Sequence, residues 1–247
     1  MASIAVITPY HQEPLEVLEQ CHRSVLAQEP AADHFMVADG FPNPQVAGWK
    51  VRHVVLPQAH GYGGSVPRGV GAMLAEAQGY EFVAFLDADN WYHPGHLASL
   101  VELQRRTRAP VCSSLRTFHQ PDGTPIETVE AAEDQLVHVD TSCLLIHRSA
   151  FSALPVWMHL PQQIFKLCDR VFVAALRHKR FAIASTRQRT VAYRTLYQTH
   201  YEAAGLPLPA GFKPTNILHP SYEWLNTREG VALTVERLGF WPAAYMA

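Results

Sequence analysis

Two carboxylates that could hold a cation stand at positions 87 and 89, directly after the apolar run Phe82–Leu86. At the end of a buried strand, Asp87 and Asp89 would lose hydration and repel each other unless a cation or hydrogen-bond donors compensated them. Mg²⁺ and Mn²⁺ prefer oxygen ligands, and Mg²⁺ is commonly held by one or two carboxylates together with a substrate's phosphates. The alternative is a solvated turn in which Asp89 and Asn90 cap the next helix. The spacing of the two aspartates leaves both interpretations open.

The segments around these aspartates alternate between strand and helix. Strands are expected at 3–8, 34–38, 51–56 and 82–86. Helices are expected after Pro14, through Ala77 and over 94–108. This alternation predicts an α/β fold with a mostly parallel sheet covered by helices on both faces. Ligands of such sheets bind outside the carboxyl ends of the strands, where Asp39, Asp87 and Asp89 would lie.

The second half of the chain is less regular. Its apolar segments predict strands at 111–118, 137–147, 181–184 and 190–193, some of them antiparallel. Asp169 opens the segment 168–178, which has helical periodicity. Because Asp is a favoured N-cap residue, this carboxylate can be explained as a helix cap. Beyond Gly205 the chain is rich in proline and aromatic residues and indicates no clear element.

Composition excludes several classes of protein. The chain has 247 residues, 48% of them hydrophobic, and its formal net charge of -2 leaves no basic excess to neutralise a nucleic-acid backbone. Its longest apolar runs are far shorter than the ~20 residues of a membrane-spanning helix, and its N-terminus lacks the basic segment of a secretory signal. The four cysteines show no metal-ligand spacing, which indicates reduced, buried thiols. We therefore expect a cytoplasmic protein without a transmembrane segment, with peripheral membrane contact left open.

Five segments, in their order and spacing, resemble family 2 of the glycosyltransferases. They are Ile4–Glu13, Cys21–Gln28, Val37–Gly40, Gly63–Gly71 and Phe85–Leu97. The resemblance covers roughly residues 3–200 and is densest over 3–100. It implies the GT-A fold, with a Rossmann-like, mostly parallel central sheet and a smaller antiparallel part in the second half. The family often has two adjacent aspartates where this chain has Ala38 and Asp39, and a further aspartate where it has Asn90.

The resemblance also implies which residues bind the donor, a nucleotide-diphosphate sugar. By position, Asp39 would reach the base, Arg68 would lie near the nucleotide, and Asp87 would contact the ribose or the metal. Asp89 would be the main ligand of a Mn²⁺ or Mg²⁺ ion on the diphosphate. The remaining donor-binding residues, which would line the base and ribose or lie between the two aspartates, are Thr8, Pro9, Tyr10, Glu13 and Ala88.

Three further residues take roles from the resemblance. Asp169 falls where the family places the base that deprotonates the acceptor hydroxyl, although Cys168 replaces an acidic residue before it and helix capping stays an alternative. His200 resembles a histidine that some GT-A enzymes use as a third metal ligand, and the alternative is an ordinary surface histidine. Trp91, directly after the aspartates, is the aromatic residue expected to stack on a sugar.

The predicted function is metal-dependent, inverting transfer of a sugar, from a UDP-sugar first and a GDP-sugar second, to an acceptor hydroxyl. The acceptor would be a glycan, a lipid-linked molecule or a small molecule. Residues 1–205 would form the transferase domain, with a nucleotide-sugar-binding half at 1–108 and an acceptor and catalytic-base half at 109–205. Residues 206–247 would be a C-terminal extension that covers the acceptor site or forms a homo-oligomer contact.

Two other functions remain as alternatives. A sugar nucleotidyltransferase resembles a different pattern, with a glycine-rich basic loop after the first strand, where this chain has Thr8–Glu13 without glycine, arginine or lysine. A catalytically silent nucleotide-sugar-binding subunit of a glycan-assembly complex would share the fold. Metal-dependent UDP binding without donor hydrolysis or transfer would favour that subunit.

Overall fold

The computed structural model describes residues 3–129 and 138–246. Across these residues nine strands form one sheet in the order β3-β2-β1-β4-β8-β6-β9-β5, and β7 pairs with β6. The strands are β1 (Ile4–Tyr10), β2 (Asp33–Ala38), β3 (Arg52–Val55), β4 (Phe82–Phe85), β5 (Trp91–Tyr92), β6 (Val111–His119), β7 (Pro125–Ile126), β8 (Leu144–His147) and β9 (Ile183–Arg194). The mixed, mostly parallel sheet confirms the predicted fold class.

The N-terminal half of the sheet is parallel, as the alternation of strands and helices predicted. β1 pairs with β2 and β4, and β2 pairs with β3. Pairing of β1 with β4 ends at Ile7, whereas pairing with β2 continues through Pro9 and Tyr10. Pro9 has no amide hydrogen to donate to a neighbouring strand. None is needed on the β4 side, because β4 does not pair with β1 beyond Ile7. β1 can therefore extend beyond the proline and carry its last residues to the edge where ligands bind.

The C-terminal half of the sheet is mixed. β8 is antiparallel to both β4 and β6, whereas β6 and β9 are parallel. The strand predicted at 137–147 begins only at Leu144, after a 3₁₀ turn over Thr141–Cys143, and its first predicted residue, Val137, lies outside the described residues. The two strands predicted at 181–184 and 190–193 are one strand, β9, whose register shifts opposite Ser113–Arg116.

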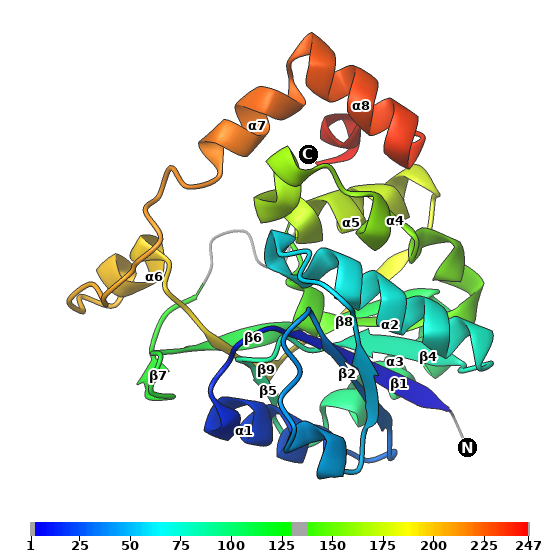
Figure 1. The fold of residues 1–247 in the computed structure, drawn as a ribbon, viewed down its shortest axis with the longest axis vertical. Coiled ribbons are helices and arrows are strands. Elements are labelled where there is room, and N and C mark those ends of the chain that lie inside the picture. Colours follow the sequence, from blue (N-terminus) through cyan, green and yellow to red (C-terminus); the bar gives the residue numbers. More distant parts are fainter. Residues whose placement is uncertain (1–2, 130–137, 247) are drawn as a thin grey trace.

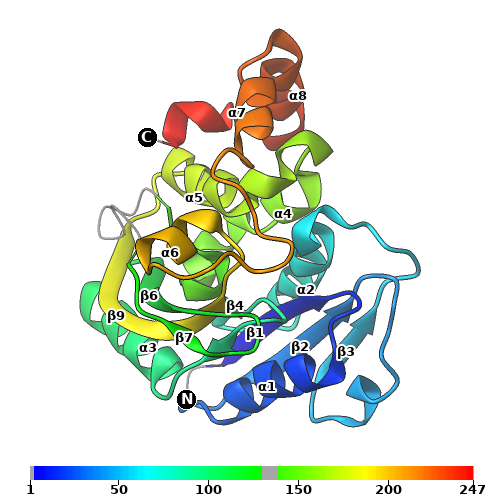
Figure 2. The ribbon, with the colours of Figure 1, turned by 90° about the vertical axis from the view of Figure 1, so that its left-hand side faces the viewer.

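Helices cover both faces of the sheet (Figure 1). Helices α1 and α3 lie on one side, and α2, α4 and α5 lie on the other, as the turned view also shows (Figure 2). The helices are α1 (Leu15–Leu26), α2 (Ser65–Ala77), α3 (His96–Thr107), α4 (Val156–His159), α5 (Cys168–His178), α6 (Gln198–Ala203), α7 (His219–Leu225) and α8 (Arg228–Leu238).

Helix α2 lies unusually close to the sheet because Gly71 faces it. A Cβ atom at Gly71 would lie only 2.6 Å from Ile7 Cγ2 and 3.0 Å from Val37 Cγ2. The absence of a side chain lets the helix backbone approach the strands directly. This approach brings the first turn of α2, with Arg68, over the carboxyl ends of β1 and β4.

Residues beyond 205 return to the body of the protein. Lys213 pairs with Tyr197 in a β-bridge, and the Phe240 ring stacks on His178 of α5 with centroids 4.7 Å apart. Arg177 Nη1 donates a hydrogen bond to the Tyr245 carbonyl oxygen over 2.9 Å. In the described part of the chain, no helix has the length and apolar character needed to cross a membrane.

Candidate active site

A cavity of about 350 Å³ opens at the carboxyl ends of β1, β2 and β4. We call it the donor cavity. It is lined by Pro9, Tyr10, His11, Glu13, Asp39, Gly61, Tyr62, Gly63, Gly64, Pro67, Arg68, Asp87, Ala88 and Asp89. The cavity therefore gathers most of the donor-binding residues that the sequence predicted.

Arg68 and Asp87 form the central ion pair of the donor cavity. Arg68 Nη2 donates to Asp87 Oδ1 over 2.5 Å, and the arginine side chain is only 3% exposed whereas that of Asp87 is 32% exposed. Arg68 also stacks over the Trp157 ring at 4.8 Å and donates to the Gly63 carbonyl oxygen over 3.3 Å. The guanidinium is thus fixed from three sides. Its positive charge compensates the carboxylate of Asp87. In the described structure the carboxylate of Asp89 has no ion-pair partner of this kind.

Asp89 faces the donor cavity and remains exposed to solvent there, although protein atoms crowd around it. This crowding, together with the negative charges of Asp87 and Glu13, raises the pKa of Asp89 to about 7. Carboxylates that accumulate negative charge in this way are suited to bind a cation, which favours their ionised forms. The oxygen donors of Asp87 and Asp89 therefore fit Mg²⁺ or Mn²⁺.

Among the residues that the structure describes, no His, Cys, Asp or Glu side chain joins these two aspartates as a third metal ligand. Within residues 3–129 and 138–246, no group of three or more His, Cys, Asp or Glu side chains could hold a metal ion. His200 lies elsewhere, in a neighbouring cavity, where its Nδ1 is 2.7 Å from Thr195 Oγ1. It is buried rather than on the surface, because its ring packs against Phe118. Two carboxylates plus diphosphate oxygens are a common arrangement for Mg²⁺.

Asp39 organises the glycine-rich loop at the rim of the donor cavity. Its Oδ1 accepts from the His60 backbone N–H over 2.9 Å, and its Oδ2 accepts from the Gly61 N–H over 2.8 Å. The loop then turns through Gly64, whose φ of +72° is the left-handed conformation that glycine adopts without strain. Asp39 thus lines the cavity and also holds the loop that closes its side.

The end of β1 contributes differently from what the sequence predicted. Tyr10 lines the donor cavity, and its hydroxyl accepts from the Asn43 backbone N–H over 3.0 Å. Thr8 does not line it. The Thr8 hydroxyl is fully buried, 2.8 Å from His34 Nε2, among residues below α1. Since side chains alternate along a strand, Thr8 and Pro9 point to opposite faces, and of these two only Pro9 lines the donor cavity.

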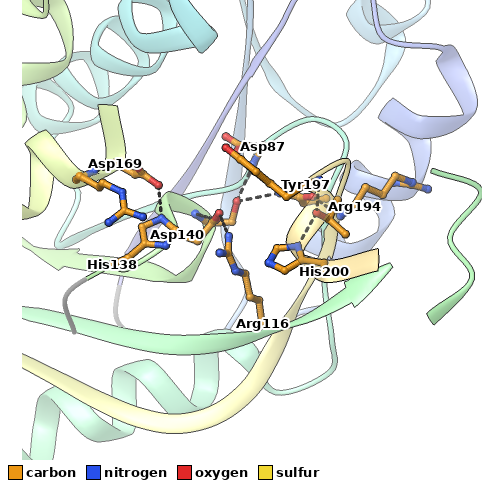
Figure 3. Close-up of polar contacts among 12 residues, drawn as sticks. Asp87, Arg116, His138, Asp140, Asp169, Arg194, Tyr197 and His200 are labelled. Atoms are coloured by element: carbon orange, nitrogen blue, oxygen red, sulfur yellow. Dashed lines mark hydrogen bonds and ion pairs between the residues drawn. The ribbon is translucent and has the colours of Figure 1, made fainter. Parts of the chain in front are cut away.

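Asp169 lies in the first turn of α5 and is paired with a histidine that the sequence analysis did not single out. His138 Nε2 donates to Asp169 Oδ2 over 2.5 Å, and the two side chains are 17% and 21% exposed (Figure 3). Burial would raise the pKa of Asp169, but the charge and hydrogen bond of His138, together with the charge and backbone N–H of Arg170, outweigh burial and lower the pKa below its usual value. Asp169 is therefore an ionised carboxylate with access to solvent.

A second cavity, of about 240 Å³, connects the donor cavity with Asp169. We call it the connecting cavity. Its wall includes Arg68 and Asp87 on the donor side and Asp169 on the other, so the predicted donor residues and the predicted base face one space. Helices α2 and α5, far apart in sequence, bring them together.

Asp140 and Ser142 connect Arg116 of β6 with the residues that follow β4. Asp140 Oδ2 accepts from Arg116 Nη1 over 2.5 Å, and its Oδ1 accepts from the Ser142 N–H over 2.9 Å (Figure 3). Ser142 Oγ in turn accepts from the Asp87 N–H over 3.2 Å and from Asn90 Nδ2 over 3.3 Å. The sequence signal was present, since Asp140 precedes the apolar run of β8, but its partners were not predictable from local pattern.

The residues after Asp89 are held by Arg194. The Arg194 guanidinium donates to the Asp89 carbonyl oxygen and lies 4.7 Å over the Trp91 ring, while its backbone N–H donates to Asn90 Oδ1 over 3.0 Å. The Trp91 ring also contacts His119, with centroids 4.6 Å apart. Trp91 lines none of the cavities described above, so the structure gives it a supporting position rather than a sugar-stacking face.

Solved structures with the same fold were found by comparison. S. aureus TarS 1-349 in complex with UDP matches with a TM-score of 0.62 at 14% identity, over 96% of this chain and 70% of that one. A longer S. aureus TarS chain gives 0.61 at 15% identity, over 96% of this chain and 43% of that one. The TarS 1-349 complex with UDP-GlcNAc gives 0.57 at 13% identity, over 96% and 71%. None of the curated proteins compared with the sequence matches it.

A family match, together with the fold, assigns the molecule to the glycosyltransferases with the GT-A fold. Residues 5–154, more than half of the chain, match the family described as Glycosyl transferase family 2. The chain belongs to this family. The matched region contains the whole donor cavity, whereas Asp169 lies beyond it.

Proposed function

We propose that the protein is a metal-dependent, inverting glycosyltransferase that takes its sugar from a UDP-sugar and uses Asp169 as the base. The observation that carries the proposal is the connecting cavity, which is lined by Asp87 and by Asp169. A donor held on one side and a hydroxyl held on the other would meet there. Direct displacement needs this arrangement, because the hydroxyl must attack the anomeric carbon opposite the leaving diphosphate.

The donor side supports a nucleotide diphosphate. Tyr10, Pro9 and the loop anchored by Asp39 offer a cleft for base and ribose, and Asp87 and Asp89 offer oxygen ligands beside it. A bound Mg²⁺ or Mn²⁺ would act as a Lewis acid that stabilises the charge on the departing diphosphate. UDP and UDP-GlcNAc are named in the TarS complexes, which have this fold, and this favours a uridine nucleotide.

The acceptor side supports general base catalysis. Asp169 Oδ2 is oriented by His138, and the other oxygen, Oδ1, accepts from the Arg170 backbone N–H over 2.7 Å. These bonds hold the carboxylate in one orientation while it remains ionised. Such a group can accept the proton of an acceptor hydroxyl as the hydroxyl attacks.

Ligand-induced thermal stabilisation tests the donor half of the proposal. Because a ligand that binds the folded state raises the melting temperature with its occupancy, UDP and UDP-sugars with Mn²⁺ should raise it more than either component alone. GDP should raise it less than UDP does. Stabilisation that does not depend on metal would contradict the proposed role of Asp87 and Asp89.

Turnover tests the acceptor half. Asp169→Asn should retain the UDP-dependent stabilisation but lose UDP release from a UDP-sugar with an acceptor panel. Asp122→Asn, in an exposed turn outside the cavities described above, is the matched control and should retain both. The anomeric configuration of the product, read by NMR, distinguishes inversion from retention. If Asp169→Asn turns over as fast as the wild type, Asp169 is not the base. If the wild type binds the donor but shows no turnover, a non-catalytic subunit is favoured.

A further inference from the structure

Three basic side chains converge beside the predicted base from separate parts of the chain. Lys166 comes from the 3₁₀ segment Gln162–Leu167, Arg170 from α5, and Lys213 from the stretch between α6 and α7. All three line a third cavity, of about 170 Å³, whose wall also includes Asp169 and His200. We call it the acceptor cavity.

The carboxylates of the acceptor cavity are already paired. Asp169 is bonded to His138 and Asp140 to Arg116, each over 2.5 Å. Across residues 3–129 and 138–246, the side chains of the three basic residues form no ion pair with a carboxylate. The two lysines lie over aromatic rings: Lys213 Nζ is 4.9 Å from the Tyr197 centroid, and Lys166 Nζ is 5.8 Å from the Phe165 centroid.

Like charges grouped on one cavity wall repel each other and create a positive potential that an anion would relieve. The two lysines offer mobile donors, and an arginine offers a planar fork that can bond two oxygens of a carboxylate or phosphate. The chemistry of this wall therefore suits an oxyanion.

The donor diphosphate does not account for the whole group. None of the three basic residues lines the donor cavity, where Arg68 is the guanidinium that faces Asp87. Lys166 and Lys213 also line the connecting cavity, but Arg170 faces the acceptor cavity and not the connecting one. The positive wall thus extends away from the donor, past Asp169.

We propose that Lys166, Arg170 and Lys213 form an oxyanion subsite, and that the acceptor carries a phosphate or carboxylate group near the hydroxyl that is glycosylated. This inference rests on the proposed function, since it takes Asp169 as the base for the acceptor. It also gives residues beyond 205 a part in acceptor recognition, through Lys213.

The test is calorimetric titration of three probes with the same ring, namely glucose 6-phosphate, glucuronate and glucose. Saturating UDP and Mg²⁺ keep the donor cavity filled, and the ionic strength is held constant. Either anionic probe should bind at least about tenfold more tightly than glucose, because a hydrogen bond to a charged group contributes about 1.5–3 kcal/mol. The phosphate and carboxylate arms show which oxyanion the subsite prefers.

Variants locate the binding. Arg170→Gln and Lys213→Gln should each weaken the preferred anion by about tenfold, while leaving UDP binding and glucose binding unchanged. Lys179→Gln is the matched control, since Lys179 is exposed at the far end of α5. Equal affinities for all three probes, no binding by any of them, or unchanged anion binding in both variants would overturn the proposal.

Two further outcomes separate this inference from the proposed function. If the anionic probes compete with UDP, or if Lys213→Gln weakens UDP itself, the basic wall serves the donor and the oxyanion subsite is excluded. If UDP with metal fails to bind the wild type, the proposed donor function fails, whatever the sugar probes do.

Discussion

Arg68 Nη2 and Asp87 Oδ1 lie 2.5 Å apart, joining α2 to the end of β4 at the base of the donor cavity. The arginine is almost fully buried, whereas a third of the aspartate side chain is exposed. This pair fixes one of the two aspartates and, through the stacking of Arg68 on Trp157, ties the donor cavity to the helical layer beneath it. The same guanidinium therefore holds the fold together and lines the cavity proposed to bind the donor.

Arg68→Ala should destabilise the fold. Removing one partner of a mostly buried ion pair leaves the other charge uncompensated and costs about 3 kcal/mol. Urea unfolding measures the change in the free energy of unfolding. Arg23→Ala is the matched control, because Arg23 pairs with Glu19 four residues away on an exposed helix face and should change stability by only about 0.3–0.5 kcal/mol. Equal effects of the two substitutions would mean that the Arg68 pair adds nothing to stability.

Asp89→Asn and Asp87→Asn should have opposite effects on stability. Asp89 is crowded by protein atoms and by the charges of Asp87 and Glu13, so neutralising it at pH 8 should leave the melting temperature equal or higher. Asp87→Asn removes the partner of Arg68 and should lower it. Both should weaken Mn²⁺-dependent UDP binding by at least about tenfold, because each removes a charged oxygen ligand. A lower melting temperature for Asp89→Asn would contradict the repulsion inferred at that residue.

Two buried histidines should make the protein sensitive to acid. Burial lowers the pKa of His34 and of His96 to about 3 in the folded state, against about 6.5 in the unfolded chain. The unfolded state then binds more protons between these values. Each histidine contributes stability that is present above pH 6.5 and is lost as the pH falls toward 3, at about 1.4 kcal/mol per pH unit.

Urea unfolding at pH 4, 5, 6 and 7 checks this dependence. His34→Gln or His96→Gln should flatten the slope of unfolding free energy against pH by about 1.4 kcal/mol per unit each. His159→Gln replaces an exposed histidine of α4 and should leave the slope unchanged. A wild-type slope in both buried variants would show that neither histidine takes up a proton on unfolding.

The strands were predictable where their apolar character is continuous. β2 and β4 begin and end within one residue of the predicted bounds, because their buried residues are mostly apolar on both faces of the sheet. β6 also matches its predicted bounds within one residue, although it contains Ser113, Ser114 and Arg116 and pairs antiparallel with β8. β9 was divided into two because its middle, from Ser185 to Arg189, is polar and shifts register, with Arg187 at a φ of 56°. β5 is only two residues long and forms by pairing with β9, which local pattern does not reveal.

The position of Asp87 and Asp89 at the edge of the sheet was predictable because they follow a strand, and strand ends of one sheet meet at one edge. The surroundings of Asp169 were less predictable. Asp169 was placed by family resemblance, but His138, 31 residues before it, and Lys213 reach the site only through tertiary folding. Thr8 was misplaced because the order of residues in a motif does not state which face of the strand each one takes.

His138 should set the acid limb of the pH profile of turnover. As the proposed base, Asp169 can accept a proton only as a carboxylate, so the rate should fall as the pH drops below its pKa, which His138 and Arg170 hold below the usual value. In His138→Ala burial would no longer be opposed by the imidazole. The pKa of Asp169 should rise, and the acid limb should move to higher pH with the rate on the plateau less affected.

The pH dependence of kcat/KM measures the shift, with exposed His159→Ala as control. An acid limb that stays at the wild-type pH would show that His138 orients Asp169 without changing its pKa. If His138→Gln instead keeps the acid limb at the wild-type pH while His138→Ala moves it, the effect belongs to the hydrogen bond rather than to the charge.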